Sequence, residues 1–146
     1  MATFKFRLES LKRFRKDRLM RAQKDFSDLN LRHRQLEQRM SDALGNRMTL
    51  LDDISKCQKD IGKVKLFSDL ISTESRKMKM IELEISKQSE DLERYRSWVE
   101  HLHRELKVVE NLENKQRAEF EEAKQKKDRK AVDGWVVERW SRKESQ

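Results

Sequence analysis

The sequence predicts an all-α protein in which two long helices form an antiparallel coiled-coil hairpin. Charged residues make up 42% of the 146 residues and hydrophobic residues only 35%, too few for a compact globule of this length. A helical pair can fold with this composition because it buries only a narrow apolar stripe. The chain has no proline and carries two apolar stripes with the repeat of a coiled coil. We therefore expect residues 1–146 to form a single coiled-coil hairpin domain.

The first stripe extends from Ala22 to Val64 in alternating steps of four and three residues, and only two of its 13 positions are polar. Such a repeat stays on one helical face only if the helix supercoils around a partner. Phe4, Leu8 and Leu11 extend a helical pattern toward the N-terminus, so the first helix is predicted over about residues 4–62. The stripe consists of Ala22, Phe26, Leu29, His33, Leu36, Met40, Ala43, Arg47, Leu50, Ile54, Cys57, Ile61 and Val64.

The second stripe lies between Met78 and Val109 and has one polar residue among its ten positions. Gly62 is suited to a helix C-terminus and Ser68 to the N-cap of a new helix, which predicts a turn at about residues 63–68. The second helix is then expected over about residues 69–140. Its stripe consists of Met78, Ile81, Ile85, Gln88, Leu92, Tyr95, Val99, Leu102, Leu106 and Val109.

Two polar stripe residues, Arg47 and Gln88, suggest how the helices align. If Arg47 faces Gln88, both interruptions share one layer and the remaining layers stay almost entirely apolar; a polar layer of this kind specifies register. A shift by one heptad would place Arg47 against Ile81 instead. The preferred alignment centres the turn near Phe67, places Phe4 near Ala131, and leaves residues 132–146 as an unpaired end.

The sequence offers no enzymatic chemistry. We expect no catalytic residues, no metal site and no cofactor, because His101 and His103 lie about 200° apart on a helix and no nucleophile cluster or phosphate loop is present. The single Cys57 excludes an internal disulfide. No apolar run approaches the roughly 18 residues of a membrane span, and the N-terminus lacks a secretory signal. The chain is therefore expected to be soluble and intracellular.

The net charge of +8 suits an acidic partner, although 27 acidic residues are interspersed with 35 basic ones. The basic segment 12–21 followed by a heptad resembles the layout of a leucine-zipper transcription factor. It lacks the base-reading asparagine, and we predict no nucleic-acid partner. Trp135 and Trp140 lie beyond the predicted pairing, where they either form a contact surface or cover the end of the hairpin.

Both ends of the sequence carry runs that resemble the FliJ family of flagellar type III export proteins. The first is Phe4-Lys5-Phe6-Arg7-Leu8-Glu9-Ser10-Leu11. The second comprises Leu112-Glu113-Asn114-Lys115-Gln116-Arg117-Ala118-Glu119-Phe120-Glu121-Glu122 and Lys127-Asp128-Arg129-Lys130-Ala131-Val132-Asp133. Together with the length and the hairpin, the resemblance covers the whole chain.

The resemblance implies a stalk-like coiled coil that binds the hexameric export ATPase with its paired ends. It also implies coupling to the cytoplasmic domain of the export-gate membrane protein and contacts with export chaperones. Such a protein would be cytoplasmic and peripheral to the inner membrane at the flagellar base, held there by its partners. The ATPase-binding end would consist of Phe4, Leu8, Leu11, Arg13, Phe120, Arg129, Asp133 and Trp135.

The family's gate contact is implied at Phe67, Leu70 and Ile81. Two positions depart from the family pattern. Glu74 falls where the gate stripe would be apolar, and Gly134 follows Asp133 where a glutamate is usual, which could end the second helix early. The alternative to an export stalk is a generic coiled-coil scaffold or secretion chaperone with no ATPase coupling.

Overall fold

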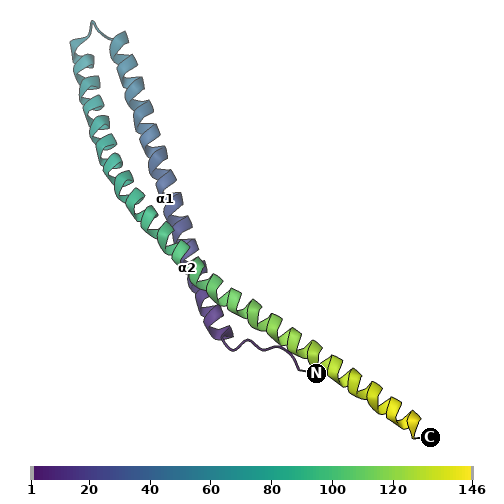
Figure 1. The fold of residues 1–146 in the computed structure, drawn as a ribbon. Helices are drawn as coiled ribbons and strands as arrows, with labels where there is room; N and C mark the ends of the chain where they lie inside the picture. Colours follow the sequence, from purple (N-terminus) through teal and green to yellow (C-terminus); the bar gives the residue numbers. More distant parts are fainter. Residues whose placement is uncertain (1, 146) are drawn as a thin grey trace. The chain divides into compact units, whose positions relative to one another are not determined.

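The structure is a computed structural model that describes residues 2–145, and it contains two long helices (Figure 1). Helix α1 spans Glu9–Lys56 and helix α2 spans Ile61–Glu144, with 48 and 84 residues. No strand occurs in the described part of the chain. The predicted all-α hairpin is therefore confirmed. Contacts divide the chain into two units, Met20–His101 and Met1–Leu19 with Leu102–Gln146, which are described separately.

The two helices are joined by Cys57–Asp60 and not by the predicted turn at residues 63–68. Asp60 forms the N-cap of α2, since its carboxylate Oδ1 accepts a hydrogen bond from the Lys63 backbone N–H at 3.3 Å. Its carbonyl oxygen accepts the N–H of Val64 at 3.0 Å. Gly62 therefore lies in the first turn of α2 and Ser68 lies inside the helix, so neither has the capping role that the sequence suggested.

In the unit Met20–His101, the seam between α1 and α2 follows the heptad. Ala22, Leu36 and Ala43 are buried, and the other seam residues of α1 as far as Cys57 are half-buried. Ile61 continues the stripe by spacing but is 82% exposed at the start of α2. The unbroken spacing across the loop is the reason why the first helix was predicted to extend to residue 62.

The loop position overturns the predicted pairing of Arg47 with Gln88. Arg47 precedes the end of α1 at Lys56 by nine residues, whereas Gln88 follows the start of α2 at Ile61 by 27. At 1.5 Å per residue the two positions differ by about 27 Å along the hairpin. The heptad alone could not reveal this error, because a shift by whole heptads returns seam residues to seam positions.

Counting outward from the loop brings polar seam residues of the two helices to the same levels. Arg47 is level, within about one helical turn, with Glu74, and His33 is level with Gln88. All four side chains are half-buried. Glu74, which departs from the family's apolar pattern, thus lies in the seam near the arginine of the other helix.

In the other unit, Leu19 of α1 and Leu102, Leu106 and Val109 of α2 form the buried core, and Leu102 is only 1% exposed. Helix α1 begins at Glu9 and not near residue 4. Phe4 precedes it and its ring centroid lies 5.7 Å from that of Phe120, so the predicted position of Phe4 beside Ala131 is wrong. Helix α2 continues through Gly134 to Glu144, so Gly134 does not end the helix early.

Candidate functional site

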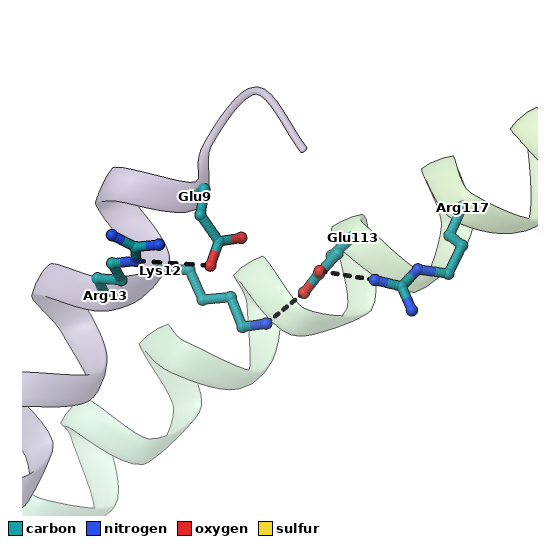
Figure 2. A network of polar contacts seen from close by, with 5 residues as sticks. All are labelled: Glu9, Lys12, Arg13, Glu113 and Arg117. Atoms are coloured by element: carbon teal, nitrogen blue, oxygen red, sulfur yellow. Dashed lines mark hydrogen bonds and ion pairs between the residues drawn. The ribbon is translucent and has the colours of Figure 1, made fainter. Parts of the chain in front are cut away.

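The candidate site is the paired end, defined as residues 4–19 together with residues 102–120 of α2. Its centre is a polar network between the two helices (Figure 2). The Lys12 ammonium donates a hydrogen bond to Glu113 Oε2 at 2.6 Å, and Arg117 donates to Glu113 Oε1 at 3.3 Å. Arg15 adds a 2.7 Å hydrogen bond to the Glu105 carbonyl oxygen. These contacts join the first turns of α1 to the middle of α2.

Glu113 is the buried charge of this network, with its residue only 8% exposed. The hydrogen bond from Lys12 lowers the pKa of the Glu113 carboxyl, and burial opposes this shift. The same hydrogen bond raises the pKa of Lys12. Both shifts favour the charged forms, so the carboxylate and the ammonium stay paired across the neutral pH range.

An aromatic contact closes the paired end beyond this network. Phe4 and Phe120 meet in a tilted arrangement at an interplanar angle of 52°, which is favourable for two aromatic rings. The Arg117 guanidinium carbon lies 5.4 Å from the centroid of the Phe4 ring, within the range of a cation–π interaction. Arg117 thus connects the ion-pair network to the aromatic pair.

The structure brings together the members of the predicted ATPase-binding end that lie at the paired end. Phe4 packs on Phe120, Leu11 is half-buried, and Leu8 is 37% exposed. Arg13 is exposed, with its Nε 3.8 Å from Glu9 Oε1. These residues lie together at the paired end, which combines apolar side chains with exposed cations.

The remaining predicted members lie on the overhang, defined as residues 121–144 of α2. Every residue of this segment is exposed. Asp133 and Trp135 are two positions apart, about 200° around the helix, so they lie on opposite faces. Arg129 lies two and a half helical turns after Phe120. The predicted set of eight residues is therefore divided between the paired end and the overhang.

The predicted gate-binding residues lie in the unit Met20–His101. Phe67 and Ile81 are half-buried seam residues, whereas Leu70 is 42% exposed. The three residues lie within about 60° around α2, so they share one side of the helix, which faces partly into the seam. Their role in binding the gate stays a prediction, and Leu70 is the member most available to a partner.

In a comparison with protein families, the family described as Flagellar FliJ protein matches residues 4–145. The chain belongs to the FliJ family. The matched range includes both units and thus confirms the resemblance found at the two ends. No curated protein and no solved structure matched the chain. FliJ proteins are non-catalytic components of flagellar protein export, and membership of the family makes this chain a flagellar export component.

For this FliJ-family chain, two kinds of feature are absent from the described residues. No group of three His, Cys, Asp or Glu residues in the described range is placed to hold a metal ion. Neither helix, within the same range, is both long and apolar enough to cross a membrane. What the paired end offers chemically is a combination of exposed cations and partly covered aromatic rings, which suits contact with an acidic protein surface.

Sequence reasoning missed Lys12, Glu113 and Arg117 as a network, although a signal was present. Continuing the second stripe past Val109 in steps of four, three and four residues reaches Glu113, Gln116 and Phe120. A glutamate at a seam position requires a cationic partner on the facing helix. The basic segment of α1 supplies Lys12 for this purpose.

Proposed function

We propose that this FliJ-family protein is a non-enzymatic stalk that binds the hexameric export ATPase through the paired end. The observation that supports this is that the N-terminal segment meets residues 112–122, a run that resembles the family, where Phe4 packs against Phe120 and Lys12 pairs with Glu113. Neither segment forms this surface alone, so an intact hairpin is required for binding. Exposed cations such as Arg13 would face acidic groups in the lumen of the ATPase ring.

The proposal extends to the other export components. The stalk couples the ATPase to the cytoplasmic domain of the export gate, with Leu70 as the accessible part of the implied gate contact, and it also binds export chaperones. Arg129 and Asp133 continue the ATPase-facing end onto the overhang. The protein acts in the cytoplasm, peripheral to the inner membrane at the flagellar base.

ATPase turnover in the presence of purified full-length variants tests the proposal. Arg13→Glu reverses a charge at the paired end, and Arg96→Glu makes the same change in the unit Met20–His101. The two arginines are matched: their side chains are 78% and 66% exposed, and each lies within 4 Å of a glutamate one helical turn away. Neither exposed pair contributes much to stability.

We expect the wild-type chain and Arg96→Glu to raise ATPase turnover equally. Arg13→Glu should need at least about tenfold more protein for half of the effect, because a like charge replaces an attractive one. Equal stimulation by both variants would remove the paired end from the ATPase contact. Absence of stimulation by the wild-type chain would instead favour a scaffold or chaperone without ATPase coupling.

A further inference from the structure

The overhang carries large apolar side chains that nothing in the described chain covers. Trp135 is 59% exposed, Trp140 67%, Val132 60% and Val136 40%. On a helix these four residues recur at spacings of three and four, so they share one side. Such a patch on a segment without a helical partner marks a contact surface.

The same side of the overhang is cationic. From Arg129 onward, a sector about 160° wide contains the four apolar residues together with Arg129, Arg139, Arg142 and Lys143, and it contains no acidic residue. Asp133 lies about 20° outside the sector, next to Trp140, and Glu138 and Glu144 each lie about 40° outside one of its edges. We name this sector the cationic-aromatic face.

Side-chain positions confirm that cations and indoles share this surface. The Arg139 guanidinium carbon lies 5.1 Å from the centroid of the Trp135 ring. One shallow hollow is lined by Trp135, Val136, Arg139, Trp140, Lys143 and Glu144. The indoles of Trp135 and Trp140 and the cations of Arg139 and Lys143 therefore line the same hollow.

This combination fits the boundary between water and lipid. Tryptophan prefers the headgroup level of a bilayer, where its apolar ring and its N–H are both satisfied. Valine gains by leaving water, and each Lys or Arg near an anionic leaflet is attracted by the surface potential. A helix of this kind lies in the plane of the interface without spanning the membrane.

We propose that the cationic-aromatic face binds anionic phospholipid headgroups at a membrane surface. This goes beyond the proposed function, in which partners alone hold the protein at the membrane. The acidic residues outside the face remain in water when the helix lies on the bilayer. The interaction does not depend on the ATPase, so it can be measured with the full-length chain alone.

Co-sedimentation with vesicles tests this proposal. We expect the full-length protein to bind vesicles of equal parts phosphatidylcholine and phosphatidylglycerol and to bind phosphatidylcholine alone weakly. R139Q/R142Q/K143Q removes three charges from the face and should weaken binding by about 100-fold, at roughly a factor of five per charge. K126Q/K127Q/K130Q removes three charges from the other side and should bind nearly as the wild type does.

The aromatic contribution has its own control. W135A/W140A should lose at least about tenfold in vesicle affinity, while Trp98→Ala, in the other unit, should not. Equal losses for both charge variants would overturn the proposal, because binding would then follow net charge and not the face. The proposal would also be overturned if the wild-type chain did not bind anionic vesicles and W135A/W140A lost ATPase stimulation. The cationic-aromatic face would then bind a protein and not a membrane.

Discussion

The paired end and the unit Met20–His101 both have polar side chains in an apolar seam, but they differ in whether the polar atoms have hydrogen-bond partners. At the paired end, Glu113 accepts hydrogen bonds from both Lys12 and Arg117. In Met20–His101, three buried polar atoms have no hydrogen-bond partner among the described residues: His33 Nδ1, Arg47 Nε and Gln88 Oε1. An unsatisfied buried polar atom lowers the free energy of unfolding by about 1–3 kcal/mol, whereas a buried pair that is hydrogen-bonded changes it little.

This difference indicates separate roles for the two sets of residues. The paired polar groups at the end hold the first turns of α1 against α2 by direct contacts. The unsatisfied groups in Met20–His101 contribute little attraction between the helices. Their effect is to disfavour alignments of α1 and α2 that would place them against apolar residues. A polar seam residue therefore reveals little about its partner until the loop between the helices is located.

Truncation of the core should have the largest effect on stability. Leu102→Ala removes a side chain that is 1% exposed and should lower the free energy of unfolding by about 2–5 kcal/mol. Ile85→Ala, at a half-buried seam position in Met20–His101, should cost less, because the site already contacts water. Urea unfolding followed by circular dichroism gives both values, and equal losses would contradict a better packed core at the paired end.

Replacing unsatisfied polar groups should stabilise the protein. His33→Leu combined with Gln88→Leu removes two of the three unpartnered atoms and should raise the free energy of unfolding by roughly 2 kcal/mol. Lys12→Leu with Glu113→Leu removes a satisfied pair and should bring no such gain. Thermal melts compare the two double variants. A larger gain at Lys12 and Glu113 would reverse the comparison.

The smallest effect should appear in the pH dependence of the paired end. Because the pKa of Glu113 is lowered on folding, its contribution is present above the ordinary glutamate pKa of about 4.3 and is lost as pH falls through the folded value. The stability difference between wild type and Glu113→Gln should therefore shrink between about pH 5 and pH 3. The raised pKa of Lys12 keeps the ammonium charged throughout this range. A difference that stays constant in melts across these pH values would show that the pair does not contribute.

The sequence was a reliable guide to local pattern and a poor one to alignment. The stripe from Ala22 to Cys57 and the stripe from Met78 to Val109 occupy the seams as predicted, because heptad spacing follows from helix geometry. Tyr95 is the exception in the second stripe, since it is 36% exposed. The turn was misplaced because Ile61 and Val64 continue the first stripe across the loop. Asp60, directly before the apolar Ile61, was the N-cap signal that would have located it.

What the sequence by itself determined is what a helix determines locally: the long helices, the two seams, and the presence of tryptophans and cations on one side of residues 129–143. The tertiary structure decided which distant residues meet, with Phe4 beside Phe120 and Lys12 beside Glu113. It thereby decided that the overhang begins after Phe120. The reason is that a heptad repeat is the same after every seven residues, so helix pairs can exchange one alignment for another until a loop and a few specific contacts select one.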